Sequence, residues 1–143
     1  MSDKPIKASE DALELMKQRG LGTLAEKMGI ELIELSAERA VATMPVAGNT
    51  QPIGLLHGGA HVVLAESLGS FAANVHAHPW GYAVGIELNA THHASVTEGV
   101  VTGTCVAIKL GKTLTSHEIS MTDENGRLLS TVRITNYLRP KGQ

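Results

Sequence analysis

Residues 51–70 read QPIGLLHGGAHVVLAESLGS, and this stretch decides the fold of the chain. It begins as a loop, because its proline and first glycine interrupt regular structure. Apolar side chains then recur at three- and four-residue spacing as far as Val75, and the opposite face is hardly more polar. From Gly58 to Val75 the only charged side chain is Glu66, if His61 is neutral. The sequence therefore predicts a buried helix that carries one unexplained carboxylate.

The composition is that of a globular protein of single-domain size. Of the 143 residues, 43% are hydrophobic, and the formal net charge is −2. We predict one domain over residues 1–143, and the near-neutral charge gives no reason to expect nucleic acid or a membrane surface as a partner. Cys105 is the only cysteine, so no internal disulfide can form. Together with a polar N-terminus that lacks the apolar core of a signal peptide, this predicts a cytoplasmic protein.

The rest of the chain predicts a helical extension followed by strands. Helical spacing covers residues 8–18, within an N-terminal extension of about residues 1–25. Residues 29–35 mix helical spacing with alternation, whereas strand patterns cover residues 39–46, 84–93, 99–110, 114–122 and 128–137. The links between the later strands look like hairpin turns, at residues 95–98, 110–113 and 123–127. The last link contains Asn125-Gly126, which is the strongest turn signal of the three.

One long buried helix and several long antiparallel strands have an economical arrangement. A sheet of five to six strands wraps around the helix, which gives an α+β fold. Such a sheet still has an unpaired edge and one open face, so we expect the protein to form oligomers.

The start of the predicted helix is suited to bind a carbonyl oxygen. Near Gly58 the first backbone N–H groups have no intrahelical acceptor and carry the positive end of the helix dipole. Donors of this kind stabilise an oxyanion, and glycine lets a ligand approach the backbone closely. Gln51 and His57 could add side-chain donors, provided that the loop folds back.

Glu66 and Ser70 lie four residues apart and therefore share one face of the helix. A carboxylate beside a hydroxyl can position a water molecule or act as nucleophile or base. Glu66 is ~12 Å along the helix from Gly58, so one helix alone is not expected to place both around one carbonyl. Two antiparallel helices related by a two-fold axis could place Gly58 of one helix and Glu66 of the other around the same carbonyl. A purely structural interpretation also stays open, in which Glu66 pairs with an arginine or histidine of the sheet and the glycines only allow tight packing.

Residues 51–70, followed by Val-Gly-x-Glu-Leu-Asn-Ala-x-His at residues 84–92, resemble the hotdog-fold acyl-CoA thioesterases. The branch is the PaaI-like and 4-hydroxybenzoyl-CoA type, and the closest likeness is to the 1,4-dihydroxy-2-naphthoyl-CoA hydrolases and the enterobactin-pathway proofreading thioesterases. The likeness runs from about residue 42 to residue 129. It implies hydrolysis of an acyl-CoA thioester by a hotdog fold, in which an antiparallel sheet wraps around a long central helix.

The resemblance also implies a role for each residue of the opening motif. Glu66 matches the catalytic carboxylate, which acts either as nucleophile on the thioester or as general base for water. Gly58 matches the residue whose backbone N–H polarises the thioester carbonyl. Gln51 and His57 match side chains that orient the substrate, and Ser70 matches the hydroxyl that helps to hold the hydrolytic water.

Further residues are expected around the substrate. His92 resembles the strand histidine near the acyl group, and Ile53 stands where similar enzymes often have an aromatic side chain, which would leave a smaller wall of the acyl pocket. Lys109 and Lys112 could meet the phosphates of CoA, although ordinary solvated lysines fit equally well. His61 occupies a position that is usually small.

The resemblance implies a homodimer as the minimal active unit and a homotetramer as the usual assembly. CoA is then part of the substrate, and neither a cofactor nor a metal is expected, because His61 and Glu66 are five residues apart rather than the four of a helical ligand pair. Two alternatives remain, a hotdog enoyl-thioester hydratase or dehydratase, and an acyl-CoA binding module without catalysis. Trp80 and Tyr82 could line the acyl site or cap the sheet.

Overall fold

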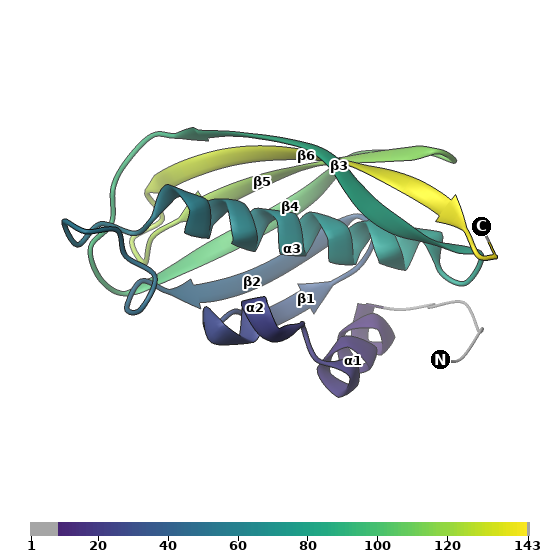
Figure 1. Cartoon of the computed structure of the whole chain (residues 1–143), viewed down its shortest axis with the longest axis horizontal. Coiled ribbons are helices and arrows are strands. Elements are labelled where there is room, and N and C mark those ends of the chain that lie inside the picture. The colour runs from purple at the N-terminus through teal and green to yellow at the C-terminus, as the bar shows by residue number, and fades with distance from the viewer. Residues whose placement is uncertain (1–8, 143) are drawn as a thin grey trace.

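The predicted buried helix is the centre of the fold. In the computed structural model, which describes residues 9–142, this helix is α3 (Gly58–Ala77), and it crosses one face of a sheet lengthwise (Figure 1). Leu64, Leu68 and Ala72 on its inner face are completely buried. The other elements are α1 (Ser9–Arg19), α2 (Thr23–Lys27), β1 (Glu31–Leu35), β2 (Arg39–Pro45), β3 (Gly81–His92), β4 (Val100–Leu110), β5 (Leu114–Thr122) and β6 (Leu128–Pro140).

The six strands form one antiparallel sheet in the order β1-β2-β4-β5-β6-β3. The helix contacts strands β2 to β6, while α1 contacts β1 and lies with α2 beside that edge (Figure 1). The predicted α+β fold, with a sheet of five to six strands around a long helix, is therefore confirmed. The turns that join β4 to β5 and β5 to β6 are hairpins as predicted, and Gly126 adopts a φ of 80° in the second.

The hairpin predicted at residues 95–98 is wrong. β3 pairs with β6 at the edge of the sheet, whereas β4 lies between β2 and β5, so the segment between β3 and β4 crosses from the edge to the middle. A backbone hydrogen bond of 2.8 Å from the Leu56 N–H to the Val96 carbonyl ties this crossover to the loop before α3. A short polar link between two strands looks the same in sequence whether or not the strands are neighbours, since long-range contacts choose the pairing.

Close packing of α3 on the sheet depends on glycine. A Cβ atom at Gly69 would overlap the Ile134 side chain of β6, so only glycine lets the helix come this near. Around this contact Met44, Ile119 and Met121 are completely buried. Each large apolar side chain removed from water in this layer stabilises the fold by ~1.5–3 kcal/mol.

The strand β3 forms one edge of the sheet and is unusually open. Val84 is 40% exposed and Ile86 is 59% exposed, although both are apolar side chains in a strand. A β-bulge between Gly85 and Glu87 bends β3 at this point. Within residues 9–142, no helix has the length and apolar character needed to cross a membrane.

Candidate active site

The loop before α3 folds back on itself, as the predicted roles of Gln51 and His57 require. Thr50 and Leu56 form an isolated bridge, and the Gln51 N–H donates to the Leu55 carbonyl at 2.8 Å. The His57 N–H donates to the Asn49 carbonyl at 2.9 Å, which closes the loop at its base. Gln51 is thereby held beside the first turn of α3.

His57 caps the helix with its side chain. Its Nδ1 accepts a hydrogen bond of 2.8 Å from the Gly59 N–H. Because Nδ1 accepts, the ring proton of the neutral imidazole lies on Nε2, which remains a donor. None of the hydrogen bonds found in residues 9–142 uses the N–H of Gly58, the first residue of the helix. The start of α3 therefore has donors left for a ligand.

These donors face a pocket of about 330 Å³. Its polar lining includes Gln51, Gly58, His61 and His92, and its apolar lining comes from Leu55, Leu56 and Val96. The end of β3 reaches over the start of α3 so closely that a Cβ atom on Gly58 would lie 2.7 Å from His92 Nε2. The structure thus brings together three of the residues singled out in the sequence, Gln51, Gly58 and His92.

The orientation of the His92 ring is set by β6. Ser130, which is completely buried, donates its hydroxyl proton to the Thr91 carbonyl at 3.2 Å. The 2.9 Å contact between His92 Nδ1 and Ser130 Oγ then requires the proton to lie on Nδ1. In the neutral ring Nε2 is left as an acceptor that faces Gly58. A proton taken up at Nε2 would convert the ring into a donor at the same place.

His61 forms the floor of this pocket. It is 4% exposed, and its ring centroid lies 5.4 Å from that of His92. Burial, followed by the neighbouring His92, lowers the pKa of His61 from 6.5 to about 4, so the ring is neutral near pH 7. Its Nδ1 has no hydrogen-bond partner among residues 9–142. The imidazole at this usually small position therefore acts as an uncharged wall.

Glu66 lies on the exposed side of α3, next to the bulge of β3. Its Oε1 is 3.1 Å from where a Cβ atom of Gly85 would be, and its side chain is open to solvent in the single chain. Neither of the two salt bridges found in residues 9–142 includes Glu66. The interpretation in which this carboxylate pairs with an arginine or histidine of the sheet is therefore not supported.

Ser70 is one turn further along α3 and points to β6. Its hydroxyl donates to Asn136 Oδ1 at 3.3 Å, and the Asn136 amide donates to the Gly69 carbonyl at 3.5 Å. Asn136 is completely buried, so it holds the hydroxyl at the junction between helix and sheet. Neither Glu66 nor Ser70 lines the pocket at Gly58. The groups of the opening motif thus form two separate sets on one helix, ~12 Å apart by helical rise.

The other predicted substrate residues lie outside both sets in the single chain. Ile53 is 79% exposed at the tip of the loop. Lys109 and Lys112 line a shallow hollow at the β4–β5 turn. That turn lies beside the end of α3, because His76 Nε2 donates to the Gly111 carbonyl at 2.8 Å. The two lysines are therefore at the opposite end of the helix from Gly58, and their contact with CoA phosphates stays a prediction.

Ser130 and Asn136 were missed in the sequence. Asn136 did leave a signal, because it interrupts the alternating inward series of β6 that includes Ile134 and Leu138. Ser130 left none, since its importance depends on pairing opposite His92. In the part of the chain that the structure describes, no three histidine, cysteine or carboxylate side chains gather as metal ligands would.

An antiparallel sheet wrapped around one long helix, with N–H donors at the start of that helix that are unpaired within residues 9–142, is the architecture of the hotdog-fold thioesterases. Residues 53–130 match the sequence model of the Thioesterase superfamily. The proofreading thioesterase EntH of Cronobacter turicensis is 43% identical over 124 residues, which make up 86% of this chain and 90% of the relative. The chain belongs to the Thioesterase superfamily, and its class of reaction is thioester hydrolysis.

Solved structures agree with this assignment. A thioesterase of Haemophilus influenzae superposes with a TM-score of 0.84 at 29% identity, and the match covers 96% of this chain and 94% of that one. A variant of a Pseudomonas aeruginosa thioesterase gives a TM-score of 0.82 at 36% identity over 90% and 94% of the two chains. The resemblance to hotdog thioesterases, including the proofreading branch, is confirmed.

Proposed function

We propose that this protein hydrolyses an aromatic or similarly apolar acyl-CoA to the free acid and CoA, at a site shared between two copies of the chain. One observation carries the proposal. Gln51, Gly58 and His92 line a pocket at the start of α3, whereas the exposed Glu66 and the half-buried Ser70 lie more than two turns later on the same helix. Two antiparallel helices related by a two-fold axis would bring both sets to one thioester.

In this mechanism the start of α3 polarises the thioester. The Gly58 N–H donates to the carbonyl oxygen, and His57 Nε2–H and the Gln51 amide are available to orient the substrate. A single donor to a developing oxyanion contributes ~3 kcal/mol to lowering the barrier. His92 presents Nε2 to the same space, next to the acyl carbon.

Glu66 of the second copy supplies the carboxylate. It can act by either of two mechanisms, as general base or as nucleophile. As general base, it takes a proton from water while the water oxygen bonds to the acyl carbon, after which the C–S bond breaks and the thiolate is protonated. As nucleophile, it displaces the CoA thiolate to form an anhydride, which water then hydrolyses to the acid and free carboxylate. Ser70 would hold the water in either route. The reaction as proposed uses no bound cofactor and no metal, since CoA is part of the substrate.

The open edge of β3 supports the dimer. Val84 and Ile86 are exposed apolar side chains on the last strand of the sheet, directly beside Glu66 and Gly85. Such an edge is stable in water when a second strand pairs with it, and an identical β3 related by a two-fold axis would do so. A tetramer of two such dimers is the further expectation from the resemblance. Lys109 and Lys112 are proposed as contacts of the CoA phosphates, with Ile53 as a wall of the acyl site.

Release of free thiol from a panel of acyl-CoA esters tests the proposal. The panel consists of acetyl-CoA, 4-hydroxybenzoyl-CoA, phenylacetyl-CoA, 1,4-dihydroxy-2-naphthoyl-CoA and octanoyl-CoA, and a thiol-reactive dye measures CoA. We expect release well above spontaneous hydrolysis for at least one aromatic ester. Hydration of an enoyl-CoA without thiol release would indicate a hydratase instead, and retention of acyl-CoA without release would indicate a binding module.

A further inference from the structure

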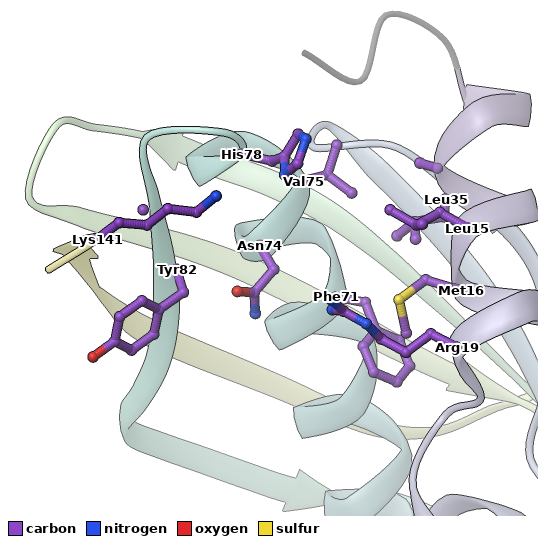
Figure 2. A pocket seen from close by; sticks show the side chains of 12 residues that line it. Leu15, Met16, Arg19, Leu35, Phe71, Asn74, Val75, His78, Tyr82 and Lys141 are labelled. Carbon is purple, nitrogen blue, oxygen red and sulfur yellow. The ribbon is translucent and has the colours of Figure 1, made fainter. Parts of the chain in front are cut away.

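A cavity of about 250 Å³ lies between α1 and α3, away from the pocket at Gly58 (Figure 2). Leu15 and Met16 of α1 form one wall, Phe71 and Val75 of α3 form the facing wall, and Leu35 of β1 also lines it. An apolar cavity of about 150 Å³ is enough to hold benzene, so this one has room for a ring system or a medium-length alkyl chain.

Asn74, the polar side chain at the α3 wall, is already paired with the backbone. Its amide donates to the Ser70 carbonyl at 2.8 Å, and its Oδ1 accepts from the Ala83 N–H at 2.9 Å. Because these hydrogen bonds are made within the chain, an occupant does not need to supply polar partners at this wall. Arg19, His78 and Lys141 also line the cavity, but most of its lining is apolar, so it suits an apolar group.

The cavity continues the face of α3 that carries the carboxylate. Glu66, Ser70 and Asn74 follow one another at four-residue intervals and so share a face, and Asn74 lines the cavity. From Glu66 to Asn74 the helix rises by ~12 Å. A group attached to a carbonyl at Glu66 must extend by about that length to enter the cavity, which an acetyl group cannot do.

We propose that this cavity receives the distal part of the substrate's acyl group, and that α1 is the wall that selects acyl groups by length. The preferred substrates are then esters with a bicyclic aromatic or medium-chain acyl group. The inference rests on the proposed function, because it takes Glu66 as the group that meets the thioester. Leu15 and Met16 lie outside residues 53–130, which match the superfamily, so this wall can vary while the catalytic stretch stays the same.

The position of α1 is fixed well enough to act as a wall. Ala12 is 1% exposed and belongs to the same core cluster as Leu35, and Met16 and Phe71 pack against that cluster. Lys17, the neighbour of Met16, is exposed and does not line the cavity. The two adjacent positions therefore provide a cavity-filling variant and a matched control.

Met16→Trp tests the inference by filling the cavity. We expect kcat/KM to fall ~10-fold or more for octanoyl-CoA and 1,4-dihydroxy-2-naphthoyl-CoA but to stay within about 2-fold for acetyl-CoA, because overpacking affects only groups that enter the cavity. Lys17→Trp should behave like the wild type. Met16→Ala should move the preference to longer chains. Unchanged acyl preference in both Met16 variants, or an equal loss with acetyl-CoA, would overturn the inference.

A binding measurement separates this inference from the proposed function. S-alkyl-CoA thioethers cannot be hydrolysed, so their affinity, measured by calorimetry, does not depend on catalysis. We expect affinity to rise with alkyl length up to about eight carbons in the wild type, and Met16→Trp to abolish the increase. Length-dependent binding without thiol release from any ester would contradict the proposed function and keep the cavity assignment. Affinity independent of length would contradict the cavity assignment alone.

Discussion

α3 divides at Glu66 into two parts with opposite surroundings, a first half from Gly58 to Ala65 and a second half from Glu66 to Ala77. The first half, from Gly58, faces a pocket in which His92 is oriented by Ser130, and His57 caps its start by accepting from the Gly59 N–H. The second half carries the exposed Glu66 and then borders an apolar cavity. In the proposed mechanism, the first half holds the carbonyl oxygen, and the second half attacks the carbonyl carbon and holds the apolar acyl group. This difference is the reason for proposing that two copies of the chain complete one site.

Removal of the carboxylate is the strongest test of the second half. Glu66→Gln keeps the shape of the side chain but cannot take a proton or attack a thioester, so we expect kcat to fall by ~10³-fold. CoA binding and thermal stability should be unchanged, since Glu66 is exposed. Glu31→Gln, at an exposed position of β1, is the control and should retain full activity. Normal turnover by the Glu66→Gln variant would contradict the assignment of Glu66 as the catalytic carboxylate.

Mixing two inactive variants tests whether the halves come from different chains. Gly58→Val places a side chain against His92 and should inactivate the first half. Refolding this variant with an equal amount of Glu66→Gln makes hybrid dimers with one intact site, so about a quarter of the wild-type activity should return. Each variant refolded alone should remain inactive. Absence of any recovery, with hybrid dimers present, would mean that both groups act within one chain.

Acidification should lower the free energy of unfolding through His61, which lies in the first half of α3. The folded pKa of His61 is lowered to about 4, while the unfolded chain takes up the proton near 6.5. Stability linked to this group is therefore complete above about pH 6.5 and is lost as the pH falls towards 4, with about 2 kcal/mol lost between pH 7 and pH 5. Urea unfolding of His61→Ser at both pH values should show a smaller loss.

His117 provides the comparison for that experiment. Burial is the main cause that lowers the pKa of His117, and this residue lies on β5 rather than at the pocket. His117 should still contribute acid sensitivity in the His61→Ser protein. The loss of unfolding free energy between pH 7 and pH 5 should therefore become smaller in this variant but should not disappear. An identical loss of stability in wild type and His61→Ser would show that His61 is not the neutral buried group described above.

The smallest effect is expected from Ser130. Ser130→Ala removes the acceptor of the His92 Nδ1–H group, so the ring loses its preferred tautomer. We therefore expect kcat/KM to fall ~5-fold. Nitrogen NMR of His92 should then show a mixture of tautomers. Thr131→Ala removes the partner of the exposed His93 and is the matched control, with near-normal activity expected. A single unchanged tautomer in Ser130→Ala would contradict the proposed role.

The sequence pattern predicted individual elements well and their neighbours poorly. Apolar spacing predicted α3, and alternation predicted β2 and β4 to β6 with boundaries close to the observed ones. The composition of residues 95–98 predicts a hairpin, but local turn composition does not report which strands pair. That error concealed the pairing of His92 with Ser130 across β3 and β6. The cavity between α1 and α3 had no signal, because its walls are far apart in sequence.

By itself, the sequence determined the central helix and the chemistry it carries. A run of apolar residues with Gly58 at its start and Glu66 within it can hardly form anything other than a buried helix with a donor end and one carboxylate. Only the tertiary structure decided that His92 lies over Gly58, that Glu66 faces the open edge of β3, and that α1 encloses a cavity. These contacts depend on strand order and on packing between distant segments, which local spacing does not encode.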